Sequence, residues 1–209
     1  MKTILLQGDS ITDAGRSREN DGVRGWGYAT MAAGRMLLDY PGQFRVINRG
    51  ISGHRIVDLY ARLRKDFLSL EPDYLSILIG VSDVWHEFTD DPNGVDDEKF
   101  RKVYCMLIEE ILAAKPDVKI YILEPFMLPG AGEDPDFAEK DREVRLRAKS
   151  ARFVAEKYGL KFIPLQETFD KLCEVCEPTY WLSDGVHPTA AGHELIARKL
   201  TDEMKKDIG

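Results

Sequence analysis

The sequence predicts an α/β fold, a three-layer α/β/α sandwich in which helices cover both faces of a five-stranded parallel sheet. Short apolar runs alternate along the chain with longer amphipathic stretches. These stretches are long enough to cross over the sheet, as the connection between parallel neighbours must. A length of 209 residues suits one sizeable core, and we expect a single domain over residues 1–209.

The first half of the chain supplies three strands and two crossovers. Residues 4–6, 46–47 and 74–79 are runs of almost entirely aliphatic and aromatic residues, each too short for a core helix. Apolar residues recur at helical spacing, more weakly, over 27–40 and 54–68. We expect these two stretches to be the helices between the strands.

The second half alternates in the same way, with clearer helices. Phe100, Leu107 and Ile111 keep the three- and four-residue spacing of a helix that buries one face. The predicted strands here are 118–123 and 162–163, and the predicted helices are 100–114, 144–158 and 195–204, with a short one within 166–176.

Two connections, residues 85–97 and 124–138, are longer than is usual in such units. Both follow strands, at the edge where parallel sheets bind ligands. They therefore fit a substrate lid or a contact in a homo-oligomer, and plain surface loops equally well.

Composition argues against several partners and compartments. Lysine and arginine total 29 against 36 aspartates and glutamates, a net charge of −7. A surface of that sign repels phosphate backbones and anionic lipid, so we expect no nucleic-acid and no membrane partner. Cys105, Cys173 and Cys176 cannot all pair, and the one C-x-x-C lacks the further ligands of a zinc site. Without a signal-peptide core or an apolar run long enough to span a membrane, we expect a cytoplasmic protein.

The first strand leads into Gly8-Asp9-Ser10-Ile11-Thr12. A serine at this turn presents its hydroxyl at the sheet edge, beside the N–H groups of a helix N-terminus, which suits a nucleophile. Taken alone, the segment is more typical of a helix cap.

Two further turns after strands contain small residues. Residues 48–53, Asn-Arg-Gly-Ile-Ser-Gly, lead into a helix and can present an N–H into a cleft. Residues 80–85, Gly-Val-Ser-Asp-Val-Trp, place a polar and an aromatic side chain at the exit of the third strand. The chain contains no G-x-S-x-G, G-x-G-x-x-G or P-loop pattern, which argues against lipase-elbow, dinucleotide and ATP sites.

One histidine has a carboxylate placed to orient it. Asp184 and His187 are three residues apart, so in a turn the carboxylate can accept from one imidazole nitrogen and leave the other free. His54, His86 and His193 lack this arrangement. His187 is therefore the predicted base, although a capping aspartate beside an incidental histidine has the same pattern.

In this order along the chain, the four segments resemble the SGNH (GDSL) hydrolases, from Gly8 to Gly192. The resemblance is greatest to the carbohydrate-esterase branch, which includes acetylxylan esterases. It implies a flavodoxin-like sheet and a serine esterase that needs no metal or cofactor.

The resemblance also assigns roles to residues. It makes Ser10 the nucleophile, His187 the general base and Asp184 the group that orients the base. The oxyanion hole would consist of the N–H groups of Ser10 and Gly53 and the side chain of residue 82.

The third segment departs from the family pattern. Where the family has an asparagine, this chain has Ser82, whose hydroxyl is shorter than an amide and reaches an oxyanion only through water or after local adjustment. Loss of one oxyanion donor typically costs about 10²–10³ in turnover. We expect an active enzyme with a weakened or remodelled hole. The alternative is a low-activity, carbohydrate-binding member of the family.

The resemblance implies a small-molecule or oligosaccharide ester as substrate, with an acetyl group as the acyl part and with Asp9 and Trp85 beside it. Trp85 could stack on a sugar ring or simply close the core. The acidic surface suits a neutral acetylated sugar and does not favour an anionic lysophospholipid or acyl-CoA. Lysophospholipase or thioesterase activity is the alternative within the enzyme class.

Overall fold

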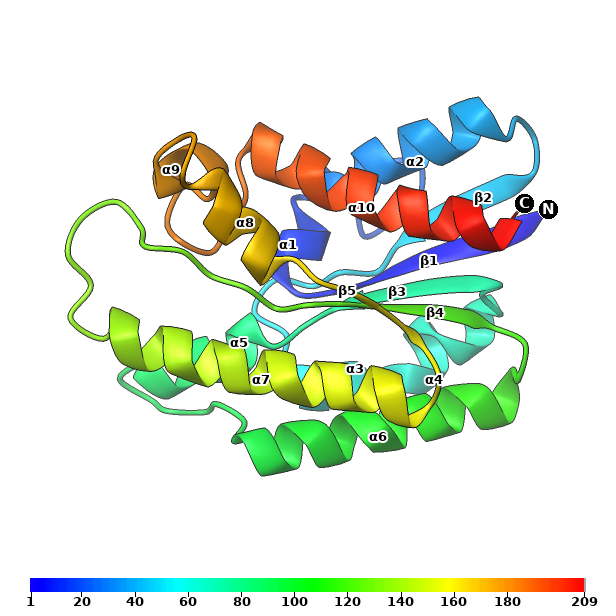
Figure 1. Cartoon of the computed structure of the whole chain (residues 1–209). Coiled ribbons are helices and arrows are strands. Elements are labelled where there is room, and N and C mark those ends of the chain that lie inside the picture. The colour runs from blue at the N-terminus through cyan, green and yellow to red at the C-terminus, as the bar shows by residue number, and fades with distance from the viewer. Residues whose placement is uncertain (209) are drawn as a thin grey trace.

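The predicted strands pair in one parallel sheet within residues 1–208, which the computed structural model of the protein describes. Their order is β2-β1-β3-β4-β5, so the chain winds to one side of β1 and then to the other (Figure 1). In sheets of this kind the ligand lies outside the carboxyl ends of the strands where the direction reverses, here β1 and β3. The strands are β1 (Lys2–Gly8), β2 (Phe44–Asn48), β3 (Tyr74–Leu78), β4 (Lys119–Leu123) and β5 (Lys161–Ile163).

Helices form the two outer layers, as predicted. In Figure 1, α2, α8 and α10 lie above the sheet, and α3, α6 and α7 lie below it. The helices are α1 (Ser10–Asp13), α2 (Tyr28–Asp39), α3 (Ile56–Ala61), α4 (Leu63–Asp66), η1 (Leu68–Leu70), α5 (Val81–Trp85), η2 (His86–Phe88), α6 (Asp97–Ala114), α7 (Phe137–Lys157), α8 (Gln166–Leu172), α9 (Pro178–Trp181) and α10 (Ala190–Ile208).

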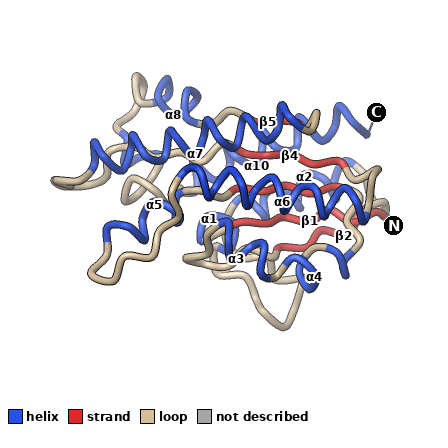
Figure 2. Tube along the Cα trace, turned by 90° about the horizontal axis from the view of Figure 1, so that it is seen from below, coloured by secondary structure: helices blue, strands red, loops and turns tan. Residues whose placement is uncertain are grey.

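Each strand contributes to two hydrophobic cores because successive side chains point to opposite faces of the sheet. Ile4 and Leu6 belong to the core between the sheet and helices α2 and α10. Leu5 belongs to the core between the sheet and helices α3, α6 and α7. Figure 2 shows α6 and α7 crossing the near face of the sheet. Burial on both faces explains why the strands read as unbroken apolar runs.

The weaker pattern over 54–68 forms three short helices rather than one. Arg62 ends α3 and begins α4, and its guanidinium turns inward to donate to the carbonyl of Arg49 at 2.8 Å and to Asp66 Oδ2 at 3.0 Å. The backbone of Arg62 departs from the helical conformation, with φ −104° and ψ 12°, where its side chain makes these contacts.

The connection after β4 begins as part of the core rather than as a lid. Phe126, Met127 and Leu128 are buried, and the Gln166 side chain hydrogen-bonds to both the N–H and the carbonyl of Met127. The N–H of Leu128 donates to the carbonyl of Gly185 at 2.9 Å. This connection therefore supports the segment that contains Asp184 and His187.

Three features are absent from residues 1–208. No helix there is both long enough and apolar enough to cross a bilayer. No three His, Cys, Asp or Glu side chains gather as metal ligands would. No disulfide links the three cysteines, which are free thiols.

Candidate active site

Ser10 lies at the first turn after β1, at the left-hand end of the sheet in Figure 1. Gly8 ends the strand where a Cβ would lie 2.2 Å from the carbonyl oxygen of Leu78, so only glycine fits between β1 and β3. Asp9 caps α1 by accepting the N–H of Ile11 at 3.0 Å. The cap and the close strand contact fix Ser10 at the N-terminus of the short helix.

Ser10, His187 and Asp184 form a continuous chain of hydrogen bonds. The Ser10 Oγ lies 2.8 Å from Nε2 of His187, and Nδ1 of His187 lies 2.7 Å from Oδ2 of Asp184. With Nδ1–H donating to the carboxylate, Nε2 remains as the acceptor that faces the serine hydroxyl. The three residues predicted from separate segments of the sequence thus lie together in the geometry of a nucleophile, a base and an orienting acid.

Asp184 is held in its charged form. Partial burial alone would raise its pKa, but the N–H groups of His187 and Val186 and the imidazole of His187 all donate to its oxygens. These hydrogen bonds outweigh the burial, so the pKa of Asp184 lies below its usual value. The carboxylate is consequently anchored by the backbone of the same turn that presents the histidine.

The predicted oxyanion residues line one pocket with Ser10. This pocket, which we call the Gly53 pocket, has a volume of about 250 Å³, and Gly53, Ser82, Trp85 and His187 are among its lining residues. Gly53 adopts a left-handed conformation with φ +76°, and no acceptor within residues 1–208 takes its N–H. Its N–H is therefore available to an oxygen bound beside Ser10.

Asp9 lies beneath the nucleophile rather than beside a substrate. Its side chain is 1% exposed and lines neither pocket around Ser10. Burial raises the pKa of Asp9 to about 6, although the N–H of Ile11, the charge of His187 and the hydroxyl of Ser82 all favour the ionised form. The expectation that Asp9 contacts substrate does not fit this position, because the residue supports the turn from within.

A second buried carboxyl, Asp83, joins the two segments that line the Gly53 pocket. Its Oδ1 accepts the N–H of Ile56 at 2.9 Å, which ties the helix after Gly53 to the helix that contains Ser82. Burial raises the pKa of Asp83 to about 8, and the charge of Asp9 raises it further against the lowering by the N–H of Ile56. The two carboxyls thus disfavour each other's ionisation beneath the site.

Trp85 lines the Gly53 pocket, with 37% of its surface exposed. Its ring already has a partner, because the Lys140 ammonium lies 4.7 Å from the ring centroid. His86, which no sequence motif singled out, lines the same pocket and lies close to Gly53.

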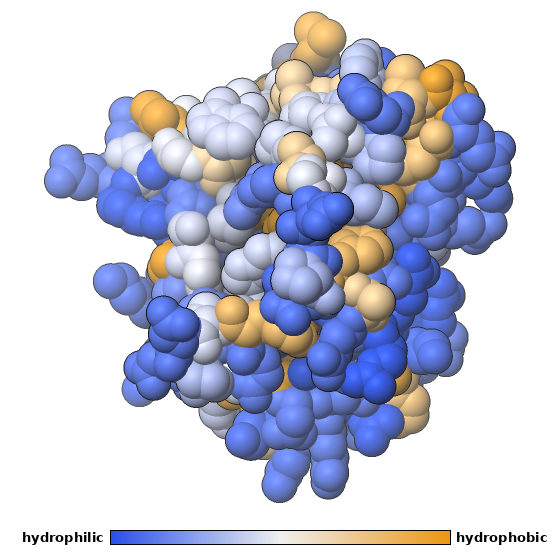
Figure 3. All heavy atoms as spheres, turned by 90° about the vertical axis from the view of Figure 1, so that its left-hand side faces the viewer, coloured by the Kyte–Doolittle hydropathy of each residue, from blue (hydrophilic) through white to orange (hydrophobic). Residues whose placement is uncertain are grey.

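A second pocket lies against Ser10, and we call it the Trp26 pocket. It has a volume of about 410 Å³, and Trp26, Arg18, Asp13 and Ser52 are among its lining residues. Figure 3 looks onto this end of the molecule, where pale atoms of intermediate hydropathy gather in the upper part and hydrophilic atoms surround them. No motif in the sequence singled out Trp26 or Arg18.

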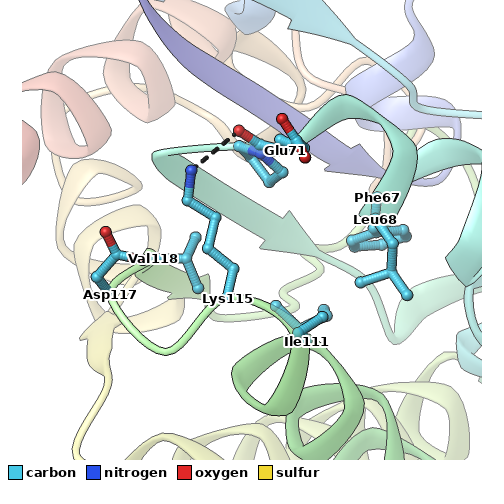
Figure 4. Close-up of a pocket in the computed structure, with 9 residues that line it drawn as sticks. Phe67, Leu68, Glu71, Ile111, Lys115, Asp117 and Val118 are labelled. Atoms are coloured by element: carbon cyan, nitrogen blue, oxygen red, sulfur yellow. Dashed lines mark hydrogen bonds between the residues drawn. The ribbon is translucent and has the colours of Figure 1, made fainter.

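A hollow of comparable size near the opposite end of the strands contains none of these residues. It measures about 450 Å³ and lies between η1 and the end of α6 (Figure 4). Its floor includes Phe67, Ile111 and Val118, and Lys115 at its rim donates to the carbonyl of Glu71 at 3.2 Å. The hollow is therefore separate from the candidate active site, which lies at the carboxyl ends of the strands.

Comparison with known proteins points to one family. The sequence pattern described as the GDSL-like lipase/acylhydrolase family matches residues 6–195. The chain is 34% identical to an acetylxylan esterase from Geobacillus stearothermophilus over 208 residues, 96% of this chain and 93% of that protein.

Solved structures agree. A crystal structure of an acetylxylan esterase from the same organism has a TM-score of 0.86 at 31% identity, over 97% of this chain and 94% of that one. A structure from Parabacteroides merdae, named provisionally as a GDSL-like lipase, has a TM-score of 0.89 at 35% identity, over 96% and 94%.

Proposed function

The chain belongs to the GDSL-like lipase/acylhydrolase family and is a carboxylic ester hydrolase, and we propose that it removes acetyl groups from O-acetylated saccharides through an acyl-enzyme on Ser10. The observation that carries the proposal is the chain of hydrogen bonds from Asp184 through His187 to Ser10. Two solved structures of the Geobacillus esterase are described as catalytic mutants, one at a serine and one at an aspartate. A serine and an aspartate also form the two ends of the hydrogen-bond series in this protein, Ser10 and Asp184.

The first half of the reaction forms the acyl-enzyme. His187 Nε2 takes the proton of Ser10 as the Oγ attacks the ester carbonyl, and Asp184 stabilises the imidazolium. The oxyanion is met by the N–H groups of Ser10 and Gly53 and by the hydroxyl of Ser82. The intermediate collapses when His187 gives its proton to the leaving alcohol oxygen.

The second half releases the acid by the same route. Water loses a proton to His187 Nε2 as it attacks the acyl carbonyl on Ser10. Collapse of the second intermediate expels Oγ, which regains its proton from His187. The products are acetate and a free sugar hydroxyl.

The acetyl group and the saccharide are supported by different observations. The Gly53 pocket, at about 250 Å³, is small enough to favour a short acyl group over a long chain. The relatives in Geobacillus stearothermophilus are described as acetylxylan and acetyl-xylooligosaccharide esterases. The pocket volume supports the small acyl group, and the descriptions of the relatives support the sugar.

The test is hydrolysis of p-nitrophenyl acetate together with acetate release from acetylated xylo-oligosaccharides. We expect Ser10→Ala to lower kcat by roughly 10³-fold or more on both, since the substitution removes the nucleophile. Ser69→Ala is the matched control, because Ser69 is exposed on η1 at the other end of the molecule. A rate that survives Ser10→Ala would sink the nucleophile assignment.

Acyl-chain preference tests the substrate class separately. We expect the acetate ester to be cleaved with a higher kcat/KM than the octanoate ester of the same alcohol. A strong preference for octanoate would point to lipid chemistry instead and would contradict the saccharide assignment.

A further inference from the structure

Ser10 stands at the boundary between two pockets. Ser10, Ser52 and His187 line both the Gly53 pocket and the Trp26 pocket. The proposed oxyanion donors Gly53 and Ser82 line only the first. The space around the nucleophile is thus divided into a side that contains Gly53 and Ser82 and a side that contains neither.

The stereochemistry of acyl transfer distributes the ester between these two sides. The oxyanion of the tetrahedral intermediate must point to its donors, so the carbonyl oxygen lies in the Gly53 pocket. The leaving oxygen must lie within reach of His187 Nε2, which protonates it. Because His187 also lines the Trp26 pocket, the alcohol part of the ester can extend there while the acetyl group stays with the oxyanion donors.

Trp26 presents a fixed aromatic surface to this second pocket. Trp26 is 63% exposed, and its backbone N–H donates to the carbonyl of Ala14 at 2.9 Å. Its ring packs edge-to-face on His193, with the ring centroids 5.2 Å apart. His193 is itself buried, and its Nδ1 accepts the N–H of Tyr28 at 3.1 Å. The indole ring is therefore exposed to solvent and is still held in place by its packing on His193.

Arg18 supplies polar contacts in the same pocket. Its Nη1 donates to the carbonyl of Gly50 at 2.9 Å, and its Nη2 donates to Asp13 Oδ2 at 2.5 Å. The side chain is still 49% exposed. A guanidinium has five N–H donors, so these two hydrogen bonds leave others for the hydroxyl groups of a ligand.

We propose that the Trp26 pocket binds the alcohol part of the ester as a pyranosyl residue, stacked on Trp26 and hydrogen-bonded by Arg18. The inference rests on the proposed esterase function. A sugar offers both an apolar C–H face for the indole and hydroxyl groups for the guanidinium. An aliphatic chain is the poorer occupant, because the half-exposed guanidinium of Arg18 would lose solvent beside it without gaining a partner.

The experiment compares an acetylated xylobiose with methyl acetate, whose alcohol is too small to reach Trp26. We expect Trp26→Ala to lower kcat/KM for the saccharide relative to that for methyl acetate by roughly five- to ten-fold, mainly through a higher KM. Trp26→Phe keeps a flat ring and should recover most of the loss. Phe153→Ala, which removes another exposed aromatic from α7, is the control that should not change the ratio.

The outcomes separate the inference from the function it rests on. An unchanged ratio, whether both rates fall equally or neither falls, would overturn the subsite alone. A parent enzyme that cleaves methyl acetate but no acetylated saccharide would overturn the proposed saccharide substrate, and the subsite with it. If Ser10→Ala still cleaves methyl acetate, the esterase mechanism fails and the subsite fails with it. A selective loss that phenylalanine restores is the result that supports the subsite.

Discussion

Ser82 is limited by the number of protons that it carries. A hydroxyl has one hydrogen, whereas a primary amide has two N–H donors. The Ser82 hydroxyl interacts with the buried carboxyl of Asp9 and lowers its pKa. The single hydrogen of Ser82 can point to Asp9 or to an oxyanion in the Gly53 pocket but not to both at once, whereas the two N–H donors of an asparagine are enough for both acceptors.

We therefore expect Ser82→Asn to raise kcat. A complete additional donor corresponds to about 10²–10³ in turnover, and at least a ten-fold gain is expected here because the serine is not wholly without effect. Steady-state hydrolysis of p-nitrophenyl acetate measures it. An unchanged kcat would mean that the serine is already an adequate donor or that residue 82 lies outside the oxyanion hole.

The sequence predicted the residues that have a chemical pattern and missed those that have only a position. The serine after the first strand, taken alone, is more typical of a helix cap, and the resemblance of four ordered segments to one family makes Ser10 the predicted nucleophile. The spacing of Asp184 and His187 lets one orient the other, which makes His187 the predicted base. Trp26 lies between two glycines in a connection with no motif, and Arg18 is one of many exposed arginines. Only the folded chain brings these two beside Ser10.

At the level of elements, two connections depend on each other. Gly130, after β4, packs so closely on the Asp184 turn that a Cβ would lie 2.6 Å from the carbonyl oxygen of Asp184. Gly185, with φ +88°, has the reciprocal problem, since a Cβ there would lie 2.5 Å from the carbonyl oxygen of Leu128. Both added Cβ atoms would meet backbone atoms, so a change of side-chain rotamer could not relieve either contact.

Gly130→Ala should consequently displace the Asp184 turn. We expect kcat on p-nitrophenyl acetate to fall by about 10²-fold or more, because misplacement of a catalytic group by about 1 Å is enough for a loss of that size. Gly34→Ala is the control, since a Cβ on that α2 glycine meets nothing within 4 Å. Equal activities of the two variants would show that the connection does not position the turn.

Elements were predictable in proportion to their length and burial. The five strands and the long helices α6, α7 and α10 follow directly from apolar runs and helical spacing. The short helices α1, α5 and α9 have four or five residues, too few for any periodicity to be visible. The division of the 54–68 stretch depends on the inward-turned Arg62, a tertiary contact that no local pattern contains.

At the level of the whole molecule, the buried carboxyls make stability depend on pH. Burial raises the pKa of Asp83 from 3.8 to about 8, so the folded protein binds this proton more tightly than the unfolded chain does. Stability from this group is full below pH 3.8, falls as the pH rises, and is lost once the pH passes about 8.

Asp83→Asn removes this titration. Relative to the parent, we expect the free energy of unfolding of the variant to fall less between pH 4 and pH 8, by roughly 3–5 kcal/mol at about 1.4 kcal/mol per unit of pKa shift. Urea unfolding at several pH values measures the difference. Asp90→Asn, at an exposed position, is the control. Parallel pH profiles for parent and Asp83→Asn would contradict the raised pKa.

The separation of 177 positions between Ser10 and His187 has a consequence for how the protein is made. Synthesis produces the proposed nucleophile well before its base. A nascent chain that has already paired β1 with β3 still lacks the Asp184 turn, so it cannot turn over an ester. The onset of hydrolysis during translation or refolding would thus mark the moment at which the Asp184 turn packs beside Ser10. Enzyme activity would report when the active site has finished folding.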